Sequence, residues 1–133
     1  MAFEYQIVPG EGIVYLVVAA PTRIEDFRTI MDLILDDPAF RTGFGFFFDR
    51  KPTAEARSID FVRGVLSYLD AHWAQIGRCR WAVLAANLAD YGMGRLQEIR
   101  SEDGPVDIRV FTDRDEALRW VRRQDQDQKR QTG

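Results

Sequence analysis

The stretch Arg80–Arg100, RWAVLAANLADYGMGRLQEIR, decides the fold of this chain. Its first part, Trp81–Ala86, is short and continuously apolar, which is typical of a strand buried on both faces of a sheet. Asp90 follows after a three-residue turn and is predicted to cap a helix. The inward face of that helix is predicted to carry Met93, Leu96 and Ile99. A strand, a turn and a helix in this order form half of a crossover unit, so we expect an α/β fold.

The beginning of the chain predicts a hairpin. Apolar and polar residues alternate from Ala2 to Ile7, which is the pattern of a strand with one solvated face. Turn residues follow at Pro9–Gly12, and Gly12–Ala20 is a second strand that is apolar on both faces. Pairing these two strands places the first at an edge of the sheet, where alternation is expected.

A helix and a central strand are predicted next. Thr22, with Glu25 three residues later, matches a capping box. The helix is expected to end at Asp36-Asp37-Pro38, because the residue before a proline resists the helical conformation. Its inward face is predicted to be Ile24, Phe27, Ile30, Met31, Ile34 and Leu35. Gly43–Asp49 contains three consecutive phenylalanines, so we expect this strand to be central and covered on both faces.

The longest helix is predicted to follow. Ser58 is the expected N-cap, an earlier start at Thr53 stays open, and Gly77 is the expected C-cap. The apolar residues at helical spacing, which are expected to point inward, are Ile59, Val62, Leu66, Leu69, Trp73 and Ile76.

The end of the chain adds one strand and one helix. Val106–Val110 alternates and predicts a fifth strand, at an edge. Asp113 and Glu116 form a second capping box, which starts a short helix. Ala117, Leu118 and Val121 are the residues of that helix expected to point inward.

The resulting order is β-β-α-β-α-β-α-β-α, and crossovers through helices require mostly parallel pairing. We therefore predict a mostly parallel five-stranded sheet packed with four helices, a single domain over residues 1–123 and a polar disordered tail over residues 124–133. The order of the strands and the distribution of the helices between the two faces stay open.

Composition narrows the class of protein. The chain has 133 residues, 46% of them apolar, so it can bury a hydrophobic core. Its net charge of −3 gives no indication of nucleic-acid binding. No apolar run approaches the length of a membrane span, and no export signal opens the sequence. With a single cysteine, Cys79, no internal disulfide is possible. We expect a cytoplasmic protein that neither binds nucleic acid nor inserts stably into a membrane.

Two segments carry a resemblance to a known family. Trp81–Glu98, with Tyr91-Gly-Met-Gly-Arg95, and Arg109–Trp120 are similar to small STAS-like proteins, which are grouped with bacterial anti-sigma factor antagonists and with CRAL-TRIO lipid-binding domains. The resemblance extends from about Gly12 to Val121. It implies a STAS-like fold and a regulatory, protein-binding or lipid-binding role, although a fold alone does not fix a function.

One departure from the family concerns its phosphorylation switch. Anti-sigma factor antagonists carry a phosphorylatable serine in an Asp-Ser-Ser/Thr-Gly turn where the second long helix starts. At the matching place this chain reads Asp49-Arg-Lys-Pro-Thr53, and Ser58 follows five residues later. The switch motif is therefore not intact, and Thr53 and Ser58 are each predicted to be plain N-caps.

The candidate binding site lies at the carboxyl ends of the strands, where ligands gather in open parallel sheets. Asp49, Arg50 and Asn87 stand at these ends, and Thr53, Ser58, Tyr91, Gly92 and Met93 stand at the expected helix starts. Gly92-Met-Gly94-Arg95 suggests an anion site, because bare backbone N–H groups would lie beside an arginine. The alternative is that Asp49 and Asn87 only satisfy loop backbone, while Tyr91 and Met93 fill the core.

No residue set specifies a reaction. His72 is the single histidine and lacks ligand spacing to other groups, and Cys79 precedes a buried strand. We therefore predict no catalytic residue, no metal and no cofactor, and a non-enzymatic regulatory or interaction module. The alternative is a protein that binds a small apolar, anionic or lipid-like ligand. A homodimer with Trp120 or an edge strand in the contact is also expected.

Overall fold

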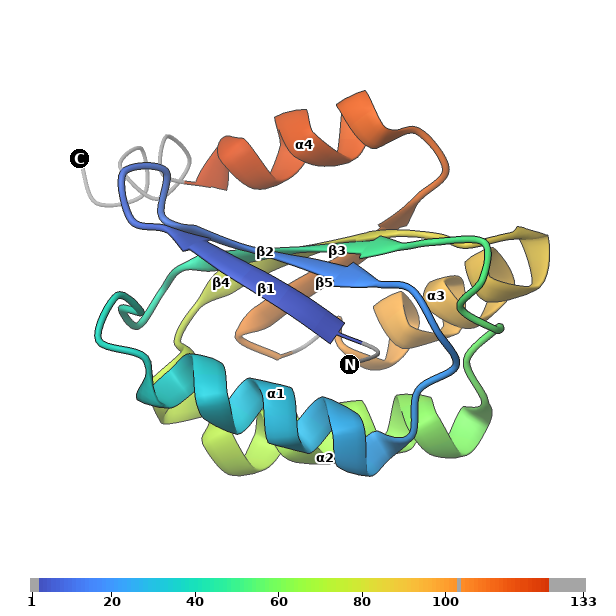
Figure 1. The fold of residues 1–133 in the computed structure, drawn as a ribbon, viewed down its shortest axis with the longest axis horizontal. Coiled ribbons are helices and arrows are strands. Elements are labelled where there is room, and N and C mark those ends of the chain that lie inside the picture. Colours follow the sequence, from blue (N-terminus) through green and yellow to red (C-terminus); the bar gives the residue numbers. More distant parts are fainter. Residues whose placement is uncertain (1–2, 103, 125–133) are drawn as a thin grey trace.

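The computed structural model describes residues 3–102 and 104–124. Its elements follow the predicted order (Figure 1). The strands are β1 (Phe3–Val8), β2 (Ile13–Val18), β3 (Gly45–Arg50), β4 (Cys79–Leu84) and β5 (Val106–Phe111), and the helices are α1 (Ile24–Asp36), α2 (Ile59–Ile76), α3 (Leu88–Arg100) and α4 (Arg114–Arg122).

The strands form one five-stranded sheet in the order β1-β2-β3-β4-β5. β1 pairs with β2 antiparallel, and every later pair is parallel. The predicted hairpin, the central position of β3 and the edge positions of β1 and β5 are thus confirmed.

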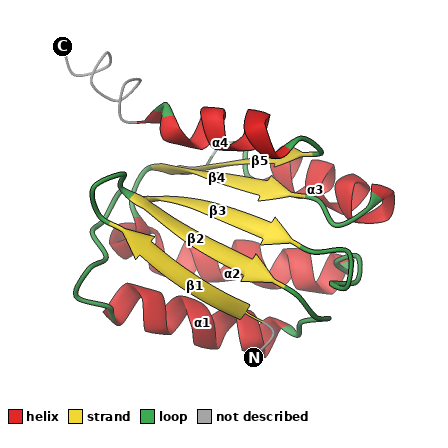
Figure 2. Cartoon of the chain, turned by 45° about the horizontal axis from the view of Figure 1, so that its top comes forward, coloured by secondary structure: helices red, strands yellow, loops and turns green. Residues whose placement is uncertain are grey.

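α1, α2 and α3 cover one face of the sheet, and α4 covers the other (Figures 1 and 2). Because side chains alternate along β3, Phe46 and Phe48 pack under α1 and α2, whereas Phe47 packs with Ala117 and Val121 of α4. α3 lies on the α1–α2 face against β5. The phenylalanine run is therefore buried on both sides, as predicted.

The first two helices match the prediction in extent and differ in detail. α1 is capped at Arg23 rather than Thr22, and its capping box is closed by Asp26, which accepts a hydrogen bond from the Arg23 N–H at 3.1 Å. α2 starts after Ser58 and ends before Gly77, as predicted. Ile59 and Trp73 were expected to point inward, but their side chains are 48% and 55% exposed.

The inward face of α3 differs from the prediction. The helix is capped by Asn87 and not by Asp90, so it begins three residues earlier than expected and presents a different face to the sheet. The buried residues are Asp90, Gly94 and Gln97, whereas Ile99 is 63% exposed and Met93 and Leu96 are half-buried. The prediction that the apolar residues of α3 point inward is wrong, because the helix buries polar side chains instead.

The predicted tail begins at a residue that is part of the packed structure. Gln124 is 4% exposed. Its side-chain oxygen accepts from the Arg80 N–H at 2.8 Å, and its amide nitrogen donates to the Gly43 carbonyl at 2.8 Å. The rest of that prediction, residues 125–133, lies outside the described residues.

Two glycines of α3 provide a matched test of its packing. A Cβ on Gly94 would lie 2.5 Å from Val110 Cγ2, so we expect Gly94→Ala to lower the free energy of unfolding by about 1–3 kcal/mol. A Cβ on Gly92 meets nothing within 4 Å, and Gly92→Ala should raise stability by up to about 1 kcal/mol through helix propensity. Denaturant unfolding measures both, and equal effects would contradict the close approach of α3 to β5.

Candidate functional site

The carboxyl end of β3 sends its two charged residues to opposite faces of the sheet. Side chains alternate along a strand, so the neighbours Asp49 and Arg50 cannot share one site. Asp49 lies on the α4 face, where it accepts from Arg114 of α4 at 2.7 Å, and Arg50 lies on the face covered by α1, α2 and α3. The predicted site therefore separates into two.

The larger of the two is a buried ion cluster around Asp90. The Asp90 carboxylate accepts from the Nε of Arg50 and from the Nε of Arg57, each at 2.9 Å. It also accepts from the backbone N–H groups of Ala86 at 2.9 Å and Arg57 at 3.3 Å. The side chains of Arg50, Arg57 and Asp90 are 5%, 4% and 0% exposed.

Further hydrogen bonds complete the cluster. Arg57 donates from Nη1 to Gln97 Oε1 at 2.7 Å and from Nη2 to the Asp90 carbonyl at 3.0 Å. Arg50 donates from Nη2 to the Glu55 carbonyl at 2.7 Å. The cluster thereby joins the end of β3, the loop between β3 and α2, and the first turns of α3.

The electrostatics of the cluster follow from its charges. Burial raises the pKa of the Asp90 carboxyl, but Arg57, the Ala86 N–H and Arg50 outweigh burial, and the pKa lies below its ordinary value. Burial lowers the pKa of Arg57, and Arg50 lowers it further while Asp90 raises it. Arginine stays charged at neutral pH, so two cations share one carboxylate.

Asp49 belongs to a separate, surface-facing group on the α4 face. Lys51 Nζ lies 2.9 Å and Arg114 Nη1 lies 2.7 Å from its carboxylate. Burial raises the pKa of Asp49, and the hydrogen bonds from Lys51 and Arg114 bring it below its ordinary value. This group fixes the start of α4 to the end of β3.

The predicted hydroxyl residues are engaged by the backbone. Thr53 Oγ1 donates to the Ala19 carbonyl, which fastens the loop after β3 to the loop after β2. Ser58 Oγ accepts from the Phe61 N–H at 3.0 Å, so Ser58 caps α2 as predicted. Thr53 does not cap a helix.

The residues predicted around Asn87 divide between cap, core and surface. Asn87 Oδ1 accepts from the Asp90 N–H at 2.9 Å and caps α3. Gly92 is exposed, Gly94 is buried, and Tyr91 and Met93 are half-buried. Gly92-Met-Gly94-Arg95 lies inside α3 rather than at its start, and Arg95 pairs with Glu98 at 2.6 Å. The backbone N–H groups that the predicted anion loop required are thus within the helix.

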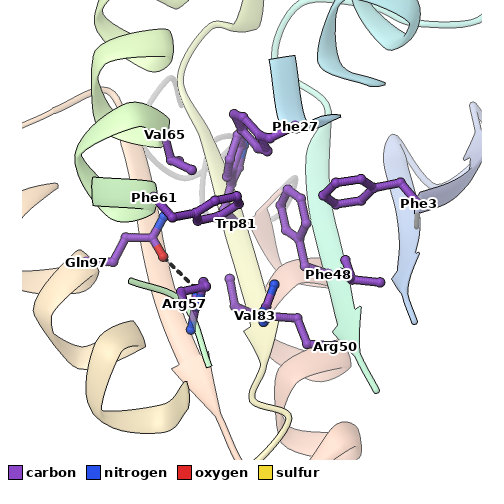
Figure 3. A pocket seen from close by; sticks show the side chains of 11 residues that line it. Phe3, Phe27, Phe48, Arg50, Arg57, Phe61, Val65, Trp81, Val83 and Gln97 are labelled. Carbon is purple, nitrogen blue, oxygen red and sulfur yellow. Dashed lines mark hydrogen bonds between the residues drawn. The ribbon is translucent and has the colours of Figure 1, made fainter. Parts of the chain in front are cut away.

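Two hollows meet at the arginines. An interior cavity of about 30 Å³, which is partly open, is lined mostly by aromatic and aliphatic side chains, with Arg50 and Arg57 at one end and Trp81 beside them (Figure 3). A second hollow of about 200 Å³, which we call the carboxyl-edge pocket, is lined by Pro21, Thr22, Arg50, Glu55, Ala56, Arg57, Ser58 and Phe61. Arg50, Arg57 and Phe61 line both.

Sequence reasoning missed Arg57, Asp90 and Gln97 as members of this site. One signal was present: Asp90, Gly94 and Gln97 are spaced four and three residues apart, as on one face of a helix, and this face lacks large apolar residues. Such a stripe indicates a helix that packs through polar contacts. The partner Arg57 lies 33 residues from Asp90, and no local pattern connects them.

Other chemistry-bearing residues lie apart from the cluster. Cys79 is buried, which raises the pKa of its thiol to about 12, with Trp81 opposing the shift. His72 Nδ1 lies 3.0 Å from the Tyr68 carbonyl, and its ring stacks on Tyr68 at 4.0 Å between centroids. Over the described residues, no three His, Cys, Asp or Glu side chains gather in a way that would hold a metal, and no helix is long and apolar enough to cross a membrane.

Comparison with known proteins identifies the fold. No family model matches the chain, and no curated protein matches its sequence. A similar solved structure is that of an uncharacterised protein of the DUF3478 family from Shewanella loihica PV-4, which has a SpoIIAA-like fold. The TM-score is 0.57 at 12% identity, over 90% of this chain and 92% of that chain. The chain thus has a SpoIIAA-like α/β fold, which confirms the predicted STAS-like architecture.

Removing the shared carboxylate tests the cluster. We expect Asp90→Asn to lower the free energy of unfolding at neutral pH by about 3–5 kcal/mol, because it leaves two buried guanidinium groups without a counter-charge. The pKa of Asp90 is depressed in the folded state, so its stabilisation is complete above the ordinary value of 3.8 and is lost as the pH falls below it. The acid-induced loss of stability should therefore be smaller in Asp90→Asn than in wild type.

A matched control uses an exposed aspartate. The side chain of Asp60 is 97% exposed, and Asp60→Asn should change stability by less than about 1 kcal/mol. Denaturant unfolding of the three proteins at neutral and acid pH measures both effects. Similar losses in Asp90→Asn and Asp60→Asn would show that the cluster does not hold the fold together.

Proposed function

We propose that the protein is a non-enzymatic interaction module that binds a protein partner in a groove beside α2. The groove, which we call the α2 groove, has a volume of about 940 Å³. It lies at the amino ends of β4 and β5, whereas the Asp90 cluster lies at the carboxyl ends of the strands. Its lining residues are Leu66, Ser67, Leu69, Asp70, Trp73, Arg78, Arg100, Ser101, Glu102, Gly104, Pro105 and Val106.

The filled interior supports this proposal over a lipid-binding role. Sites for small molecules usually enclose about 300–1,000 Å³, and a buried acyl chain needs a continuous apolar cavity. The interior cavity beside Trp81 has about 30 Å³, which is room for one or two waters. The α2 groove is a much larger hollow than this cavity, and it is open to the surface.

An exposed tryptophan carries the proposal. Trp73 is 55% exposed beside the apolar side chains of Leu66 and Leu69, and tryptophan is enriched among the residues that dominate binding energy at interfaces. The backbone leaves the helical region at His72, with φ −122° and ψ 15°, so Trp73 follows a kink in α2. The His72 ring stacks on Tyr68 one turn before the kink.

The groove also indicates the chemistry of the partner. Its lining combines apolar side chains with acidic Asp70 and Glu102 and basic Arg78 and Arg100. An amphipathic helix or extended segment fits this surface when an apolar side chain contacts Trp73 and flanking charges of both signs meet the charged residues of the lining. A strongly basic or acidic ligand would meet like charges on one side.

The state of the reactive groups supports a non-enzymatic role. The thiol of Cys79 is buried with a raised pKa, so it is a poor nucleophile at neutral pH. His72 and Asp49, which a convergent site would combine, lie on opposite faces of the sheet, because His72 is on α2 and Asp49 pairs with α4. Thr53 and Ser58 serve backbone contacts, so we do not extend the family's phosphorylation switch to this chain.

Homodimerisation remains part of the proposal, with β1 as its contact. Trp120 packs on Phe111, at 5.6 Å between centroids, and the guanidinium groups of Arg80 and Arg109 lie 5.0 and 5.1 Å from its ring centroid. The ring is therefore occupied by its own chain. At the β5 edge, the Val110 N–H already donates to Glu98 at 2.6 Å. β1 forms the other edge of the sheet, so we place the dimer contact there.

Sedimentation velocity tests the dimer. We expect a two-fold dimer at high micromolar concentration and a monomer when a proline replaces Ile7 within β1, because the Ile7 N–H points away from β2 and proline removes this edge donor. Trp120→Phe is the control and should sediment as wild type does. A monomeric wild-type protein would contradict this part of the proposal.

Partner binding is tested with substitutions of two apolar residues that are similarly exposed to solvent, Trp73 and Leu33. Wild type, Trp73→Ala and Leu33→Ala are immobilised and exposed to lysate from the source cells, and bound proteins are quantified by mass spectrometry. Leu33 lies on α1, outside the groove, and is 48% exposed. We expect one partner to bind wild type and Leu33→Ala in similar amounts. The amount of this partner bound to Trp73→Ala should be lower by about tenfold or more.

Direct binding of the purified partner completes the test. Isothermal titration should give the same ranking of the three proteins, while their melting temperatures agree within about 3 °C. Undiminished binding of the partner to Trp73→Ala would show that the α2 groove is not its site. Equal losses in Trp73→Ala and Leu33→Ala would show that the contact is non-specific.

A further inference from the structure

We infer that the carboxyl-edge pocket binds a small oxyanion, a carboxylate or a phosphate group, on Arg50 and Arg57. This site lies at the carboxyl ends of the strands, whereas the α2 groove lies at the amino ends of β4 and β5. The inference does not depend on the proposed partner. The pocket of about 200 Å³ has more than ten times the roughly 15 Å³ that one water needs. It therefore has room for an anion of this size with some of its hydration.

The first argument is the charge imbalance. Arg50 and Arg57 have side chains 5% and 4% exposed, and both pair with the one carboxylate of Asp90. Buried charges normally have full counter-charge, because burying an ion without compensation is costly. Glu55 lines the same pocket, but its side chain forms no ion pair with any described residue, and only its carbonyl contacts Arg50. The cluster retains one positive charge beside the pocket.

The second argument is the supply of hydrogen-bond donors. A guanidinium group has five N–H donors. Arg50 uses Nε for Asp90 and Nη2 for the Glu55 carbonyl, and within the described residues its Nη1 has no acceptor. Arg57 uses Nε, Nη1 and Nη2 for Asp90 and Gln97, so it supplies charge and fixes the geometry. Arg50 is thus the residue with unused donors.

The surroundings of the pocket favour an anion over a neutral ligand. Thr22 and Ser58 add hydroxyl groups to its wall, and the start of α2 at Ser58 adds the positive end of the helix dipole. Phe61 stands between the pocket and the interior cavity, where Figure 3 shows its ring near Arg57 and Trp81. The filled apolar interior behind Phe61 limits the ligand to its oxyanion group and a short substituent.

The test compares two anions on three proteins at constant ionic strength. Sodium phosphate and sodium acetate are titrated against sodium chloride, and the melting temperature is followed. Ala56→Glu adds a second carboxylate to the pocket wall beside Glu55, where it repels an anion without altering the buried cluster. Ala71→Glu is the matched control, because Ala71 is an exposed residue of α2 outside the pocket.

We expect a saturable rise in melting temperature of about 2 °C or more in wild type and Ala71→Glu and no saturable rise in Ala56→Glu. Arg50 and Arg57 Nε resonances, followed by NMR in the same titration, should shift with the same midpoint. A response to phosphate alone assigns the site to phosphate-bearing ligands, and a response to acetate assigns it to carboxylates. No saturable response to either anion, an equal response in Ala56→Glu, or a thermal response without the Nε shifts would each overturn the inference.

Discussion

The structure depends on one carboxylate that serves two arginines. Asp90 is completely buried and accepts hydrogen bonds from Arg50, from Arg57 and from the backbone before α3. Burying three ions carries a large desolvation cost, which is offset only when the hydrogen bonds are complete. The arrangement therefore tolerates few alternatives: the end of β3, the loop before α2 and the first turns of α3 must meet at one point. A hydrophobic contact of the same size would fix these segments less specifically, because it is not directional.

The orientation of α3 follows from this constraint. Asp90 and Gln97 must point toward the arginines, so the opposite side of the helix faces solvent and carries Leu88 and Ile99, which are 86% and 63% exposed. Gly94 lies on the inward side because any larger residue would press on Val110. The amphipathic pattern of α3 is thereby inverted, and its exposed apolar residues follow from the buried cluster and need no separate cause.

The fold was predictable because it rests on local signals, and the candidate site was less so. Alternation in β1, the continuous apolar strands and the Ser58 cap define the element order without knowledge of any long-range contact. The two-residue period of a strand also separates Asp49 from Arg50, although the prediction placed them together. The prediction for the inward face of α3 is wrong for a different reason. Apolar spacing predicts one face, whereas the energetically decisive contact joins Arg57 to Asp90 across 33 residues. Such a pairing is created by the topology of the sheet and has no counterpart in a local window.

The two candidate binding surfaces lie toward the two ends of α2. Ser58 and Phe61 at its start line the carboxyl-edge pocket, and Leu69 and Trp73 near its end line the α2 groove. An α-helix rises about 1.5 Å per residue, so Ser58 and Trp73 are separated by roughly 22 Å, more than twice the Debye length of about 8 Å at physiological ionic strength. Solvent therefore screens most of the direct charge effect that an anion in the carboxyl-edge pocket has on the exposed groove. Coupling requires a mechanical route, and two helices offer one. α2 lines both surfaces, and its kink at His72 lies just before Trp73. α3 holds Arg57 through Asp90 and Gln97 and lines the groove with Arg100. The two surfaces are independent as long as both helices stay rigid, and a change at the α2 kink or a shift of α3 would link them.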